Sequence, residues 1–194
     1  TTSKFSISTY TGTGSATTIG HGMGVVPACV ICKEAADSGD WVVYHHRNTA
    51  APETDVLEWN NTTTTQDNDG MWNDTAPTST LITLGGSAVL NNSSDSYVSY
   101  AWGEVSGFSR FGKYVGNVSA DGVFIYLGFK PALFIVKETG NAENWVIYDN
   151  KRGDYGNRNP NDQHLTVNGT AAASSGTAID FLSNGIKLRS NAGH

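Results

Sequence analysis

The stretch that decides the fold is "KPALFIVKETGNAENWVIYDNKR", residues 130–152, because residues 26–48 repeat its pattern as "VPACVICKEAADSGDWVVYHHRN". In each copy an apolar run follows a Pro, and a short polar turn separates it from a second apolar run. A strand, a tight turn and a strand make a β-hairpin. Pro is tolerated at a strand start, where its missing N–H costs least. The sequence therefore predicts the same hairpin twice.

The repeat extends beyond the hairpin. Residues 10–44 align without a gap with residues 114–148, at an offset of 104, and 13 of the 35 positions are identical. Residues 81–84, "LITL", match residues 185–188, "GIKL", at the same offset. Such self-similarity at a fixed period indicates duplicated structural units.

Strand patterns dominate the rest of the chain, and no stretch of ten or more residues is amphipathic at the helical period. Further strands are predicted at residues 5–11, 56–59, 80–84, 97–104, 122–127, 164–167, 179–182 and 185–189. The long polar segments 47–79 and 150–164 are interpreted as loops. We predict an all-β fold of two tandem sandwich or jelly-roll-like repeats of about 104 residues, at 1–106 and 107–194.

The second repeat is expected to lack its last strand, because the counterpart of "YVSYAWGE", residues 97–104, would fall after residue 194. Such a unit would expose unpaired backbone groups that another segment can complete by strand addition. The N-terminal segment "KFSISTY", residues 4–10, alternates suitably. Phe5, Ile7 and Thr9 are therefore the candidate strand-exchange residues, acting within the chain or on a neighbouring copy.

Composition and charge exclude several classes of function. The chain has 18 acidic and 12 basic residues and a net charge of -6, so we expect no nucleic-acid partner. No run of 18 apolar residues occurs, so we expect no membrane insertion, and the N-terminus has no signal-peptide pattern.

One part of the sequence resembles a known family. Residues 107–152, "GFSRFGKYVGNVSADGVFIYLGFKPALFIVKETGNAENWVIYDNKR", and residues 179–190, "IDFLSNGIKLRS", resemble a repeated β-rich domain of virion proteins of marine tailed phages. Residues 72–112 resemble its usual lead-in. The family domain often stands beside laminin-G-like domains in tail- or fibre-associated chains. The resemblance implies a virion or extracellular location, and it brings no catalytic or binding residues with it.

The candidate chemical groups have ordinary structural explanations. Cys29 and Cys32 spell CxxC, but residues three apart on a strand point to opposite faces, so we interpret them as apolar fillers. The histidines do not show the fixed spacing of a zinc site. The oxygen-rich stretches "DNDG", 67–70, and "NPND", 159–162, suit calcium, although Asx-rich turns look the same without an ion. We expect no cofactor, with calcium as the alternative.

Aromatic residues supply the candidate contact sites. Trp41 and Trp145 recur in the repeat, as do Tyr44 and Tyr148. Because Trp and Tyr three apart on a strand face opposite ways, at most one of each pair lies in the core. We expect the Trp there, which leaves Tyr44 and Tyr148 as contacts for a partner or a glycan.

Two further tryptophans flank the long polar segment. Trp59 and Trp72 are candidate contacts of a sugar-binding platform, and burial in the core is the alternative for both. No sequence motif of a nucleophile with its base occurs, and we expect no enzyme.

These observations predict a non-enzymatic phage structural protein, a fibre, tail or capsid-decoration component acting in assembly and host-surface adhesion. The expected partners are further copies of the chain, as a trimer or filament, other virion proteins and a host-surface glycan. The alternative function is a carbohydrate-binding module of a phage or of a secreted bacterial protein.

Overall fold

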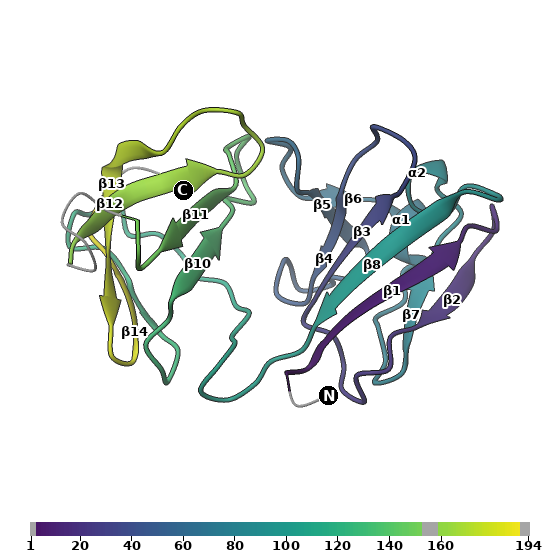
Figure 1. Cartoon of the computed structure of the whole chain (residues 1–194), viewed down its shortest axis with the longest axis horizontal. Helices are drawn as coiled ribbons and strands as arrows, with labels where there is room; N and C mark the ends of the chain where they lie inside the picture. The colour runs from purple at the N-terminus through teal and green to yellow at the C-terminus, as the bar shows by residue number, and fades with distance from the viewer. Residues whose placement is uncertain (1–2, 153–158, 191–194) are drawn as a thin grey trace. The chain divides into compact units, whose positions relative to one another are not determined.

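The computed structural model describes residues 3–152 and 159–190, and nearly all of its regular structure is β-sheet (Figure 1). The predicted all-β class is confirmed. The strands are β1 (Phe5–Thr11), β2 (Thr17–Gly20), β3 (Cys29–Glu34), β4 (Val42–His45), β5 (Asp55–Glu58), β6 (Gln66–Asp67), β7 (Leu81–Leu84), β8 (Ser96–Trp102), β9 (Phe124–Tyr126), β10 (Leu133–Val136), β11 (Val146–Asp149), β12 (Asn161–Thr166), β13 (Ser174–Leu182) and β14 (Gly185–Leu188).

Two short helices, α1 (Asp69–Trp72) and α2 (Ala88–Asn91), complete the list of elements. Within the described ranges, neither helix has the length or the apolar character that crossing a membrane requires. The chain divides into two compact units: unit one is Thr1–Val105 and unit two is Ser106–His194.

Unit one has two layers around one core. Its six-stranded sheet has the order β1-β8-β3-β4-β5-β6, and β2 pairs with β7 in a separate two-stranded sheet. Alternation along β3 turns Val30 and Cys32 inward, where they join Ile82 and Leu84 of β7. Both helices add buried side chains to this cluster. Its buried members are Met23, Val30, Cys32, Val42, Tyr44, Val56, Met71, Trp72, Ile82, Leu84, Leu90 and Ala101.

Within the segment 47–79, β5 matches the strand predicted at 56–59, and β6 and α1 were not predicted. Asn68 caps α1, its side chain accepting a hydrogen bond from the backbone N–H of Gly70. The one turn of helix turns Trp72 into the core, and its indole Nε1 donates to the Asp55 carbonyl at 3.0 Å. The prediction of a bare loop was wrong here, since a buried Trp and a cap outweigh the polar composition.

Unit two is one sheet that curves onto itself, with the order β10-β11-β12-β13-β14-β9. Val136 of β10, at one edge, shares a cluster with Ile186 of β14 near the other edge. The strand β12 begins at Asn161, inside the segment 150–164 that was interpreted as a loop; residues 153–158 of that segment lie outside the described residues.

Several elements of the two units stand at the repeat offset. The strands β4 and β11, and likewise β7 and β14, are 104 residues apart at both ends. Lys33 and Lys137, also 104 apart, each donate from Nζ across the hairpin turn, Lys33 to the Asp37 carbonyl at 2.5 Å and Lys137 to the Asn141 carbonyl at 3.5 Å. The same local sequence therefore folds the same turn in both places.

The N-terminal segment belongs to unit one. In β1, Phe5 pairs with Trp102, Ile7 with Tyr100 and Thr9 with Val98, all on β8. The proposal that these three residues complete the sheet of unit two therefore does not describe this structure. The physical reason is that the segment already has a partner strand, on which the Phe5 ring stacks at 5.1 Å from Trp102.

Candidate functional site

The outer face of the unit-one sheet is apolar over several strands. Along β8, Tyr97, Ser99 and Ala101 are buried and the residues between them are half-buried. Directly opposite residues of antiparallel strands lie on the same face. One row across this face runs through Ile7, Tyr100, Ile31, Val43 and Leu57.

Four aromatic rings line up on this outer face, and we call Phe5, Trp41, Tyr100 and Trp102 the aromatic face. The ring centroids of Phe5 and Trp102 are 5.1 Å apart, those of Trp102 and Tyr100 are 6.2 Å apart, and those of Tyr100 and Trp41 are 6.3 Å apart. All three pairs are stacked, with interplanar angles of 30°, 18° and 22°. Each of the four residues is half-buried. The rings thus form a ladder of half-buried aromatic side chains on this side of the sheet.

His45 adjoins this ladder, because it lies opposite Cys29, which in turn lies opposite Trp102. Burial lowers the pKa of His45 to about 4, and the neighbouring His46 adds to the effect. The imidazole is therefore neutral at pH 7.

Three of the four predicted contact residues lie in the core instead. Tyr44, Trp72 and Tyr148 are buried, so the prediction that they contact a glycan or a partner was wrong. Tyr44 meets Trp72 edge to face at 5.8 Å inside unit one, and the Tyr148 hydroxyl bonds the Thr177 hydroxyl at 2.6 Å inside unit two. Trp59 is half-buried and remains a candidate.

The repeated tryptophans behave differently in the two units. Trp145 is buried, as expected, whereas Trp41 belongs to the aromatic face. The expectation that both tryptophans fill the core was therefore wrong for Trp41. In both units the Tyr of the pair belongs to the core cluster, and in unit one β8 supplies Tyr100 as a stacking partner for Trp41 outside the core. The alternation of Val98, Tyr100 and Trp102 is the sequence signal that would have indicated this face.

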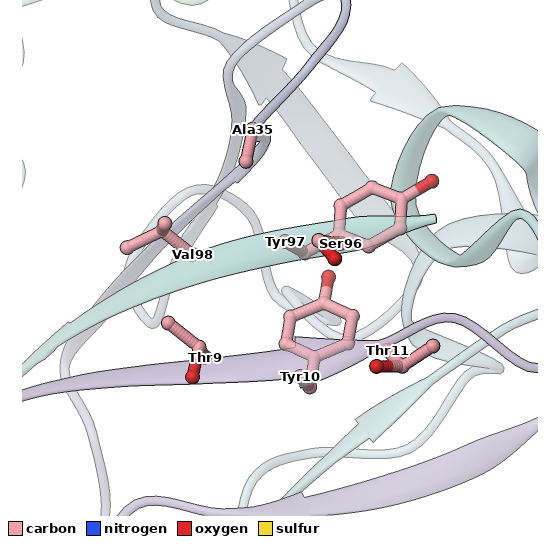
Figure 2. A pocket seen from close by; sticks show the side chains of 7 residues that line it. All are labelled: Thr9, Tyr10, Thr11, Ala35, Ser96, Tyr97 and Val98. Carbon is pink, nitrogen blue, oxygen red and sulfur yellow. The ribbon is translucent and has the colours of Figure 1, made fainter. Parts of the chain in front are cut away.

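An open hollow of about 510 Å³ lies at one end of β1 and β8 (Figure 2). It is lined by Thr9, Tyr10, Thr11, Ala35, Ser96, Tyr97 and Val98. Figure 2 shows the two tyrosine rings beside each other, and they stack at 4.9 Å. Both hydroxyls are used internally, since Tyr10 donates to the Leu90 carbonyl at 2.7 Å and Tyr97 to the Ala88 carbonyl at 3.0 Å. Burial raises the pKa of Tyr10, which keeps it protonated. The polar groups of this hollow thus serve the fold.

The remaining chemical groups are also engaged in structure. Cys29 lies on the outer side of β3 and Cys32 on the core side, and burial raises their pKa values to about 12 and about 11. His21 uses both ring nitrogens, with the Thr78 carbonyl at 3.2 Å from Nε2 and the Met23 N–H at 3.4 Å from Nδ1. In residues 3–152 and 159–190, no group of three His, Cys, Asp or Glu side chains could hold a metal ion.

The two stretches considered for calcium use their Asn side chains on the backbone. In "DNDG", Asn68 caps α1. In "NPND", Asn159 accepts from the Phe181 N–H at 2.9 Å, and Asn161 donates to the Asp149 carbonyl at 2.7 Å. These are the turn-stabilising bonds that Asx residues commonly make.

The comparisons with known proteins give one match. No curated protein and no solved structure matches the chain. A family described as a domain of unknown function (DUF7483) has a model that matches residues 1–194, and the chain therefore belongs to this family.

Proposed function

We propose that this chain is a non-enzymatic structural protein of a phage virion, a fibre, tail or capsid-decoration component that acts in assembly and in attachment to a host surface. The observation that carries the proposal is the aromatic face, a ladder of half-buried rings on the outside of a sheet. Aromatic residues are enriched where proteins contact their partners. The resemblance of residues 107–152 to virion domains supports the location.

The titratable groups support a structural role. The pKa values of Cys29 and Cys32 are raised and that of His45 is lowered, so all three side chains are neutral at pH 7. A nucleophilic thiol needs a lowered pKa, and a histidine that acts as a general base works best with a pKa near the working pH. The expected partners are copies of the chain, other virion proteins and a host-surface glycan, outside the cell.

A carbohydrate-binding module is the second candidate function, favoured by the same ladder. Sugar rings stack their C–H faces on aromatic side chains, and successive rings about 5–6 Å apart would offer a line of such contacts. The two candidates differ in what the chain binds when it is isolated.

Binding assays separate them. The wild-type chain, Trp41→Ala and Tyr100→Ala would be tested for binding to a glycan array. The same proteins would be tested as competitors of tailed-phage particles for binding to host cells. Tyr126→Ala is the control, because its exposed ring lies outside the aromatic face. The structural proposal predicts competition for host cells that both face variants lose, together with labelling of particles by an antibody against the chain. Strong binding to one defined sugar without particle labelling would favour the module. The proposal would be overturned if the antibody labelled no particles and the chain did not bind the host surface.

A further inference from the structure

The edge of β10 in unit two corresponds to an edge that is covered in unit one. The strands β3 and β10 begin 104 residues apart, and each forms the first strand of the repeated hairpin. In unit one β3 lies between β4 and β8, whereas in unit two β10 pairs with β11 and ends the sheet among the described residues (Figure 1). Unit one therefore shows what kind of segment fits beside this strand.

In unit one the outer side of β3 is covered by its neighbour β8. Cys29 lies opposite Trp102 and Ile31 lies opposite Tyr100. The two β3 side chains are only 8% and 7% exposed. Two large aromatic residues, with the small Ala101 between them, thus border this pair of positions.

In unit two the same pair of positions is bare. Leu133 and Ile135 stand 104 residues after Cys29 and Ile31, and they are 55% and 38% exposed. Their neighbours Phe134 and Val136 pack in the core, so the outward pair is set by the alternation of the strand. The exposure of these two apolar side chains is what an absent neighbouring strand produces.

The backbone groups of the same two residues point to the open edge. Asn150 donates to the Ala132 carbonyl at 3.0 Å, so Ala132, and Phe134 two residues on, direct their N–H and C=O groups toward β11. By alternation, Leu133 and Ile135 direct theirs the other way. In unit one the corresponding residues, Cys29 and Ile31, direct their backbone groups toward β8. The bond from the Ala35 N–H to the Ser96 carbonyl at 2.7 Å shows this, because Ala35 is an even number of residues from both.

The edge strand is short, but it carries no charged residue and no Pro of its own. Edge strands commonly carry a charged residue or a Pro that discourages pairing with another strand. Leu133–Val136 reads LFIV, with Pro131 and Lys137 both outside it.

We propose that the open edge of β10 is a strand-acceptor site for an extended segment of a partner chain. The segment runs antiparallel to β10 and places two aromatic residues, separated by a small one, opposite Leu133 and Ile135, as Tyr100-Ala101-Trp102 does on β3. Among the described residues, β8 is itself paired on both edges and β1 is held against β8, so neither strand is available to fill this edge, and the proposal assigns the segment to a partner chain. The inference rests on the proposed role in assembly and names the surface that carries it.

A peptide that copies residues 95–104, with two lysines added at each end for solubility, tests the proposal on the full chain by isothermal titration calorimetry. Saturable binding is expected, and Ile135→Pro should weaken it at least tenfold because it removes an edge N–H without touching the bonds to β11. Leu133→Lys is the second edge variant, and circular dichroism checks that both variants fold.

Ile7→Pro is the matched control. Ile7 is 58% exposed on β1, the edge strand of the unit-one sheet. The Lys4 carbonyl accepts from the Gly103 N–H and the Gly12 N–H donates to the Asp95 carbonyl, so even-numbered residues of this segment direct their backbone groups toward β8. The N–H of Ile7 therefore points away from β8. Binding unchanged by Ile7→Pro supports the site. Absence of peptide binding, equal binding of a scrambled peptide, or loss in Ile7→Pro alone would overturn it.

Sedimentation of the chain without peptide tests whether a second copy of the chain, and not a different partner, occupies the edge of β10. Self-association that Ile135→Pro abolishes would show that a second copy fills the edge, and it would overturn the partner-strand assignment. Failure of the proposed function is distinguishable, because peptide binding is measured without particles, cells or glycans. If the chain binds the peptide but the antibody against it labels no virion, the acceptor site is supported and the virion role is contradicted.

Discussion

Asn91 is a fully buried amide that ties three segments of unit one together. Its Oδ1 accepts from the Thr13 N–H at 2.8 Å, and its Nδ2 donates to the carbonyls of Ser15 at 2.7 Å and Gly85 at 2.8 Å. A buried polar group that loses its partner costs about 1–3 kcal/mol. The side chain is therefore worth more to the fold than its polar character suggests.

We expect Asn91→Leu to lower the free energy of unfolding by about 1–3 kcal/mol, since it removes three hydrogen bonds and leaves the buried Gly85 carbonyl without its amide partner. Urea unfolding followed by tryptophan fluorescence measures the change. Asn92→Ala, at the exposed neighbouring position, is the control and should change stability by less than about 0.5 kcal/mol. Equal effects of the two substitutions would show that the amide network contributes little.

His45 gives unit one a dependence on pH that can be assigned to one ring. Its pKa is about 4 in the folded chain and about 6.5 when unfolded, so between these values the unfolded chain binds the extra proton. Stability is therefore full above about pH 6.5 and falls as the pH drops toward 4. Because the ring is only half-buried, we expect a loss on the order of 1–2 kcal/mol at pH 5.

The measurement is the difference in melting temperature between pH 7 and pH 5 for the wild type and for His45→Gln. Carboxylates titrate over part of the same range, and the variant retains them. The wild type should lose more stability than the variant over this interval. A variant that is as sensitive to pH as the wild type would contradict the assignment to His45.

At the scale of elements, the repeat supplies matched positions with different surroundings. Gly12 and Gly116 are identical in the aligned repeat. A Cβ added at Gly12 would lie 2.0 Å from the backbone oxygen of Asn92, whereas a Cβ at Gly116 meets no atom within 4 Å. The glycine is thus sterically required where the strand β1 turns beside the loop after α2, and not in its copy.

Gly12→Ala should cost about 2 kcal/mol or more, because backbone rather than a movable side chain stands in the way. Gly116→Ala should stay within about 0.5 kcal/mol of the wild type. Thermal unfolding of both variants, measured side by side, checks the pair. A loss of stability in Gly116→Ala as large as that in Gly12→Ala would mean that the two repeats place this residue alike.

Local signals predicted the elements better than their assembly. The hairpins at 26–48 and 130–152 could be found because Pro, turn and apolar runs act over a few residues. The strand β13 was only partly found, since "GTAAASSGTAIDFL" mixes small residues and takes its strand form from pairing with β12 and β14. Pairing partners that are distant in sequence leave no such local mark.

The candidate site shows the same limit. Alternation in β8 puts Tyr100 and Trp102 on one face, but register brings Phe5 beside them, and Trp41 arrives from the turn before β4. Trp72 and Trp59 flank the same polar segment, yet α1 buries only Trp72. Whether an aromatic residue is a contact or a core residue depended on one helical turn and one strand register, which composition does not encode.

At the scale of the whole molecule, each unit has a core of its own. The buried cluster of unit one draws on residues between Met23 and Ala101, and that of unit two on residues between Val136 and Ile186. In unit one, core residues come from both of its sheets and both of its helices. A unit that closes its core within one stretch of chain meets the main requirement for folding alone.

We therefore expect a fragment of residues 1–105 to fold without the rest of the chain. Cooperative thermal unfolding and a near-ultraviolet circular dichroism signal from the packed Trp72 would demonstrate it. Trp72→Ala in the same fragment is the matched control, because removing a large buried aromatic residue costs about 3–5 kcal/mol and domains are stable by only about 5–15 kcal/mol. The variant should lose most of its melting transition. A wild-type fragment that unfolds without cooperativity would show instead that unit one needs the second half of the chain, since its own core would then be too small to hold both layers together.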